Sequence, residues 1–145
     1  HPCANNLLLS PGQVRLVQGL GADEGWGEER PSSLLELVTV YSDGKINVNT
    51  APVEVLESLD GELDRSLAEA VVDRRADMPF QAVEEVREVP GMEEAVFGRI
   101  QDLLTVKSSV FDLRFEGRWG DAVCRVQAVA EREEDGVRLV YWRVH

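Results

Sequence analysis

The sequence predicts an α+β fold, with a mainly helical part followed by a three-stranded antiparallel meander. Three observations support this class. Apolar residues recur at helical spacing from about residue 51 to 102, they alternate with polar residues from Phe111 onward, and short strand-like segments join the two regions. A chain of 145 residues, 43% of them hydrophobic, can bury one good core. We therefore expect a helical domain at 1–106 and a β-meander at 107–145.

The N-terminal part is expected to contain two short helical pieces separated by a loop. Ser10 and Pro11 suit the first positions of a helix. Residues 21–31 are rich in glycine and acidic side chains, as is typical of an exposed loop, and a serine pair then begins a single helical turn. A short strand near 38–42 follows and ends at an Asp-Gly turn.

The stretch Lys45–Pro52, Lys-Ile-Asn-Val-Asn-Thr-Ala-Pro, predicts a junction between a strand and a helix. Its first residues alternate between apolar and polar side chains, which indicates the end of a short strand. Asn49 or Thr50 is then suited to cap a helix whose first turn contains Pro52, where the missing proline N–H costs nothing.

Four helical segments are expected after the junction, at about 51–58, 64–76, 82–88 and 93–102. In each segment the apolar residues form one inward face. These inward residues are Val53, Leu56, Leu67, Ala68, Val71, Val72, Val83, Val86, Val96, Phe97 and Ile100. A short turn with a glycine joins the first segment to the second and the third to the fourth, and a Met78-Pro79-Phe80 break separates the two pairs, so we expect two helical hairpins.

A repeated pattern predicts a second short strand near 103–107. Residues 37–42 match residues 103–108 in the order Leu-x-Thr-Val-x-Ser. The two copies flank the helical hairpins, so we expect both to pack into one helical unit.

The C-terminal residues predict three strands. Phe111 begins an alternating strand, Ala122–Ala130 keep their apolar residues on one parity, and residues 137–144 are apolar on both faces. Tyr141 and Trp142 lie on opposite parities. This arrangement indicates that a partner, a missing helix or the helical unit covers the two sides of the sheet.

The charge of the chain limits its partners. The formal net charge is −12, and residues 43–106 hold fifteen acidic and six basic side chains, so the helical part would repel a phosphate backbone or an anionic membrane. We therefore expect no nucleic acid among the partners.

No pattern in the sequence indicates catalysis. It contains no nucleophile elbow, no glycine-rich phosphate loop and no Ser/His/Asp set, so we expect no enzyme activity. No cofactor is assigned with certainty. Cys124 falls on the apolar parity of its strand, which predicts a buried thiol beside a loose Cys3. A disulfide between these two residues in an oxidising compartment is the alternative.

The helical hairpins carry a motif set shared with a DNA-binding module. Asn-Val-Asn-Thr-Ala-Pro, a glycine turn, Pro-Phe and Val-Pro-Gly follow one another along the chain. This order resembles the tandem helix-hairpin-helix of DNA-uptake and repair proteins, in which two glycines per hairpin present N–H groups to a DNA phosphate. Here Leu63 and Glu93 replace the second glycine, while Glu62, Asp64 and Glu94 crowd the phosphate positions.

A fuller resemblance follows from the order of motifs along residues 5–145. An Asn-x-x-x-x-Ser leader, Val-Gln-Gly and Leu-Val-Thr-Val-Tyr-Ser-Asp-Gly-Lys-Ile-Asn-Val-Asn-Thr-Ala-Pro come first. Pro-Phe, Val-Pro-Gly-Met, Leu-Leu-Thr-Val-Lys-Ser-Ser-Val-Phe and a meander follow. The chain is thus similar to the type II secretion system protein K family of large minor pseudopilins. The resemblance implies a pilin-like fold with an inserted α-domain built on helical hairpins of the helix-hairpin-helix type.

The same resemblance implies a role and a location. Members of the family are non-catalytic subunits at the tip of the periplasmic pseudopilus, bound to the I and J minor pseudopilins. The implied location is the periplasmic face of the bacterial inner membrane, where a helix anchors the full-length protein. Because that helix has no counterpart here, the chain resembles a fragment or an atypical member, and the absent helix would explain an apolar sheet face.

Calcium is a further implication of the resemblance, since pseudopilins often bind this ion. Asp60, Glu62 and Asp64 alternate around a glycine and offer the hard oxygen ligands that calcium prefers. The alternative is that they cap a helix N-terminus and complement its dipole.

Two functions from different classes therefore remain. A structural subunit would use exposed apolar surface on its sheet, with Phe111, Trp119, Tyr141 and Trp142 as candidate contacts, although each also suits an ordinary core. A DNA-binding module would show affinity that falls steeply with salt.

Overall fold

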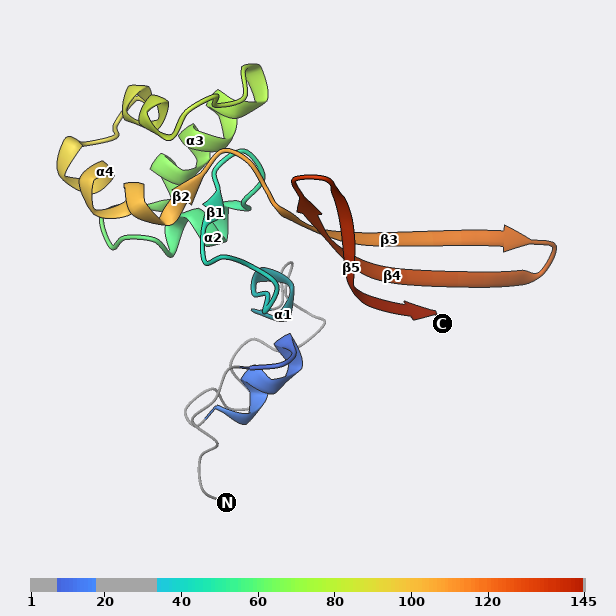
Figure 1. Cartoon of the computed structure of the whole chain (residues 1–145). Coiled ribbons are helices and arrows are strands. Elements are labelled where there is room, and N and C mark those ends of the chain that lie inside the picture. The colour runs from blue at the N-terminus through green and yellow to red at the C-terminus, as the bar shows by residue number, and fades with distance from the viewer. Residues whose placement is uncertain (1–7, 18–33, 145) are drawn as a thin grey trace.

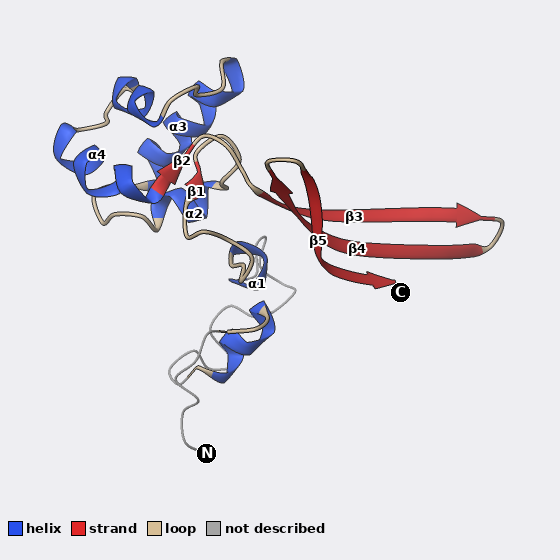
Figure 2. Cartoon of the chain, in the orientation of Figure 1, coloured by secondary structure: helices blue, strands red, loops and turns tan. Residues whose placement is uncertain are grey.

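The computed structural model describes residues 8–17 and 34–144 and combines a helical unit with a three-stranded antiparallel sheet (Figures 1 and 2). The predicted α+β class is confirmed. In chain order the elements are the 3₁₀ helix η1 (Pro11–Leu16), α1 (Leu34–Leu37), β1 (Ile46–Asn47), α2 (Val53–Glu57), α3 (Arg65–Asp77), the 3₁₀ helix η2 (Val83–Glu88), α4 (Glu94–Ile100), the 3₁₀ helix η3 (Gln101–Leu103), β2 (Leu104–Thr105), β3 (Val110–Trp119), β4 (Ala122–Glu133) and β5 (Gly136–Val144). The predicted loop at 21–31 lies outside the described residues.

The main hydrophobic core lies within residues 46–106, which we call the helical unit. Its buried members come from β1–β2 and from the turns and helices between them. Of the predicted inward residues, Leu56, Ala68, Val71, Val86, Val96, Phe97 and Ile100 are buried, and Val53, Leu67, Val72 and Val83 are partly buried against them. The predicted helical stripes are confirmed.

The strand predicted near 38–42 is wrong. After the single turn of α1 the chain is irregular, and β2 pairs in parallel with β1, matching Ile46 with Leu104. The segment has strand-like residues but pairs with neither strand of the β1–β2 sheet. Its polar side chains instead bind the local backbone, since Tyr41 N donates to Thr39 Oγ1 and Gly44 N donates to Ser42 Oγ, both at 3.0 Å.

The predicted caps of the first hairpin helix are also wrong. The residue preceding α2 is Pro52, with no side-chain cap, because Asn49 is engaged elsewhere. Its Oδ1 accepts the N–H of Phe80 at 2.8 Å, and its Nδ2 donates to the carbonyls of Phe80 and Val106 at 2.9 and 3.2 Å. The junction therefore joins three separate segments of the helical unit.

The three-stranded meander is confirmed, in the order β3-β4-β5. Its one irregularity in register is a bulge in β5, where Tyr141 pairs with Val129 and Leu139 pairs with Ala130. β5 pairs with β4 only from Val126 onward, so the β3–β4 ribbon extends beyond β5, away from the helical unit (Figure 1).

Candidate interaction surface

The strand register gives the sheet two chemically different faces. Residues directly opposite each other on neighbouring strands share a face, and the face alternates along each strand. One set of paired residues is almost wholly apolar, and we call it the apolar face. Its apolar members are Phe111, Leu113, Phe115, Trp119, Ala122, Cys124, Val126, Ala128, Ala130, Val137, Leu139, Trp142 and Val144.

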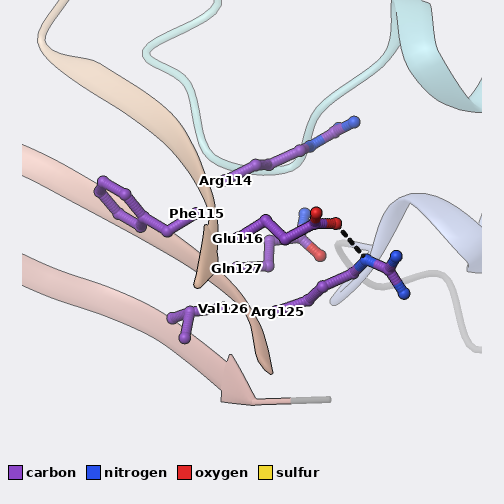
Figure 3. Close-up of a pocket in the computed structure, with 6 residues that line it drawn as sticks. All are labelled: Arg114, Phe115, Glu116, Arg125, Val126 and Gln127. Atoms are coloured by element: carbon purple, nitrogen blue, oxygen red, sulfur yellow. Dashed lines mark hydrogen bonds and ion pairs between the residues drawn. The ribbon is translucent and has the colours of Figure 1, made fainter. Parts of the chain in front are cut away.

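The opposite, polar face carries ion pairs both within and between the strands. Glu116 accepts hydrogen bonds from Arg118 at 2.7 Å and from Arg125 at 2.8 Å, and these bonds hold the pKa of Glu116 below its ordinary value. Arg138 pairs with Glu131 and Glu133 at the other end. Figure 3 shows Phe115 and Val126 on one side of the ribbon and the polar side chains on the other. Most charges of the polar face are thus paired with one another.

The apolar face is largely exposed to solvent. Its most exposed large side chains are Trp119 at 89%, Val137 at 72%, Trp142 at 59%, Phe115 at 58% and Leu139 at 58%. From the sequence, a partner, a missing helix or the helical unit could cover the sheet. The exposure of these side chains shows that the helical unit does not cover this face. Exposed apolar surface of this kind is more common at interaction sites than elsewhere on folded proteins.

Three of the four predicted contact residues lie on the apolar face. Phe111, Trp119 and Trp142 share it, with the guanidinium carbon of Arg132 5.1 Å from the Phe111 ring centroid. Tyr141 lies on the polar face, where its ring centroid is 6.4 Å from that of Tyr41. Sequence reasoning did not name Phe115 or Leu139 as contacts, although the alternation that placed Phe111 also includes Phe115.

The predicted burial of Cys124 is wrong. Its strand parity was assigned correctly, but the face on which it lies is open, so the thiol is exposed. Cys3 lies outside the described residues, and a disulfide between the two stays a prediction.

The candidate calcium ligands have other partners in the structure. Arg99 donates to both carboxylate oxygens of Asp60, at 2.6 and 2.9 Å, and to Glu62 at 2.5 Å. Hydrogen bonds from Arg99, followed by one from the backbone of Glu62, lower the pKa of Asp60 to about 2. Asp64 caps α3 by accepting the N–H of Leu67 at 2.9 Å.

A calcium ion at this turn would have to displace Arg99 from Asp60 and Glu62. Within 8–17 and 34–144, no group of three or more histidine, cysteine, aspartate or glutamate side chains is placed to hold a metal ion. Calcium binding by these carboxylates stays a prediction.

The two hairpin turns differ from a phosphate-binding pair. Leu63, at the position of the second glycine in the first hairpin, is 2% exposed and belongs to the core. In the second, Gly91 has a φ of +89°, and Glu93 precedes the first residue of α4. A shallow pocket between the turns is lined by Glu62 and Asp64. Carboxylates at this place would repel a phosphate.

Comparison with known proteins gives two matches. Residues 46–107 match the family model for type II secretion system (T2SS), protein K. The chain is also 36% identical over 74 residues to ComE operon protein 1 of Bacillus subtilis (strain 168), a match that covers 48% of this chain and 36% of that protein. No solved structure matches the chain. The predicted protein K resemblance is thus confirmed over the helical unit, whose core occupies the same residues.

The helices of the structure are short. No helix in the described ranges is both long enough and apolar enough to cross a bilayer.

Proposed function

We propose that this chain, whose residues 46–107 form a segment of the type II secretion system protein K family, is a structural subunit of a secretion pseudopilus. In this proposal it is a minor pseudopilin that assembles at the pseudopilus tip with the I and J minor pseudopilins. It acts at the periplasmic face of the inner membrane, to which a helix anchors the complete protein, and it has no catalytic role.

The exposed apolar face carries the proposal. Trp142, Phe115 and Leu139 would lose their contact with water when a partner covers them, which favours association by about 25 cal/mol per Å² of apolar area buried. The polar face offers less apolar area to bury, and most of its charges already pair with one another. Assembly through the apolar face is therefore the favoured arrangement.

The test is size-exclusion chromatography with light scattering, using this chain alone and mixed with the soluble domains of the I and J pseudopilins from the same genome. We expect a stable ternary species. The double variant Phe115→Ser/Trp142→Ser should lose it, because both side chains are exposed and their removal leaves the core intact. Arg114→Ser/Arg143→Ser, which changes two exposed residues of the polar face, is the matched control and should still assemble. Assembly that survives the apolar-face substitutions would contradict the proposed surface.

The second candidate is a helix-hairpin-helix DNA-binding module of a DNA-uptake protein. The 36% identity to ComE operon protein 1 over 74 residues is the reason to retain this alternative. The carboxylates at the hairpin turns argue against it. Retardation of duplex DNA at low salt, lost as salt rises, together with no binding to the I and J domains would replace the pseudopilin proposal by this one.

A further inference from the structure

The outer face of the small β1–β2 pair differs in chemistry from the rest of the helical unit. Ile46 packs against the core and Leu104 is 4% exposed within it. Because side chains alternate along a strand, Asn47 and its partner Thr105 lie on the opposite, outward face. By the same period Lys45 and Lys107, one before β1 and one after β2, belong to that outward side.

A pocket of about 180 Å³ lies over this outward face. The irregular segment that was predicted to be a strand forms one wall, with Thr39, Tyr41 and Ser42. Hydroxyl side chains from Thr105 and Ser108 line the opposite wall, and Asn47 Nδ2 donates to Ser108 Oγ at 2.8 Å. Hydroxyls and ammonium groups are hydrogen-bond donors, so the lining suits an acceptor ligand.

The charge at this pocket is opposite to that of the chain. The sequence has a net charge of −12 and only two lysines, and both line this pocket. All ion pairs among the described residues are made by arginines, so neither lysine is neutralised by a carboxylate there. Lys45 Nζ donates to the carbonyl of Asp102, and the one carboxylate in the lining, Asp43, accepts the N–H of Lys45.

We propose that this pocket binds a small tetrahedral oxyanion of the phosphate or sulfate class. Lys107 and Lys45 supply charge, and the hydroxyls of Ser42 and Ser108, which only accept hydrogen bonds among the described residues, supply hydrogen bonds. A volume of about 180 Å³ accommodates one such ion and is smaller than the roughly 300–1,000 Å³ typical of pockets for larger ligands. This site lies apart from the apolar face and does not depend on the function proposed for it.

The pocket lies where a bound anion would link the segment before β1 to the connection between β2 and β3. Its lining includes the segment before β1 and the residues from Lys107 to Val110, which connect β2 to β3. An anion held there would contact both the helical unit and the connection to the sheet. Binding should therefore slow amide hydrogen exchange at Gly44 and Lys45.

Isothermal titration with inorganic phosphate tests the proposal, at constant ionic strength set with sodium chloride. We expect saturable binding of one ion, competition by sulfate, and slower exchange at the two amides. Lys107→Gln should weaken binding about tenfold, because it removes one charge-assisted contact. Arg143→Gln removes the same charge from an exposed residue of β5 that does not line the pocket, and it should bind as the wild type does.

Two results would overturn the assignment. The first is the absence of saturable heat with phosphate and sulfate for a wild-type protein of native circular dichroism. The second is an equal loss of affinity in Lys107→Gln and Arg143→Gln, which would mean that phosphate responds only to overall charge. Lys45→Gln provides a second variant. If either lysine variant loses phosphate binding while its circular dichroism spectrum stays that of the wild type, the loss reflects a missing ligand contact and not unfolding.

Discussion

At the residue scale, Asn49 shows why the Asn-Val-Asn-Thr-Ala-Pro stretch has its composition. Its side chain binds Phe80 through both N–H and carbonyl and also reaches Val106, so one amide joins three segments that are distant in sequence. Arg75 completes the junction by donating to the carbonyls of Val48 and Ala51, both at 2.7 Å. No other side chain of similar size has a donor and an acceptor in this fork.

Replacing Asn49 should therefore destabilise the helical unit strongly. Asn49→Ala leaves the N–H and carbonyl of Phe80 without their partner beside a buried ring, and we expect a loss of about 2–4 kcal/mol in the free energy of unfolding. Urea denaturation followed by far-UV circular dichroism measures it. Gln101→Ala, which removes an exposed amide bound only to the Gly98 carbonyl, should cost less than about 0.5 kcal/mol. Equal effects of the two variants would contradict this role.

The Asp60–Arg99 pair predicts a pH effect with a defined sign. The pKa of Asp60 falls from 3.8 to about 2 in the folded protein, so the pair stabilises the fold above pH 3.8. That contribution is lost as the pH falls through about 2. Between pH 5 and pH 2 the wild type should therefore lose more stability than Asp60→Asn, as measured by urea midpoints at each pH. Asp121→Asn, a change in the β3–β4 turn, should follow the wild-type profile.

The same pair provides the test of calcium binding. Arg99 places a positive group between Asp60 and Glu62, so its removal should expose these oxygens to a cation. We expect calcium to raise the melting temperature of Arg99→Gln more than that of the wild type. Magnesium serves as the control, because it requires near-octahedral geometry. If calcium shifts neither protein, these carboxylates are not calcium ligands.

At the element scale, the helices followed from sequence, and so did the short strands β1 and β2, but the strand expected near 38–42 did not form. Amphipathic spacing is a local property, so Leu56, Val71 and Phe97 were placed inward correctly. A strand also needs an edge to pair with, and the residues of 38–42 cannot reveal that β2 pairs with β1 instead. The predicted cap at Asn49 failed for a related reason, since its partners lie 31 and 57 residues away.

Two glycines in neighbouring elements should respond oppositely to alanine. Gly91 has a φ of +89°, so Gly91→Ala should cost about 1 kcal/mol in backbone strain, while its added Cβ would meet Leu67 Cδ1 at an ordinary 3.6 Å. Gly98 lies within α4 with open space around it, so Gly98→Ala should stabilise by about 0.5–1 kcal/mol. Urea denaturation of both variants compares them. If both variants lose stability, the room available to the added Cβ, and not the backbone conformation, determines the effect of alanine at these positions.

At the scale of the whole molecule, the buried core and the apolar sheet face belong to different parts of the chain. The alternation of apolar and polar residues along the strands is enough to assign Phe111, Trp119 and Trp142 to an apolar surface of the sheet. The pattern could not say whether that face is buried or open, because an apolar parity is the same in both cases. Cys124 illustrates this limit, since its parity was right and its burial was wrong.

This division predicts that the helical unit folds without the sheet. Its core draws only on residues 46–106, whereas the sheet exposes the aromatic side chains of its apolar face. A chain of residues 43–108 should therefore unfold cooperatively, at a urea midpoint close to that of the whole protein. Residues 109–145 alone should show no cooperative transition, because three strands with one uncovered face are marginal in water. Far-UV circular dichroism is the measurement, since residues 43–108 contain no tryptophan or tyrosine. If the shorter chain proved unfolded, contacts with the sheet or with the residues before Asp43 would be needed for the fold.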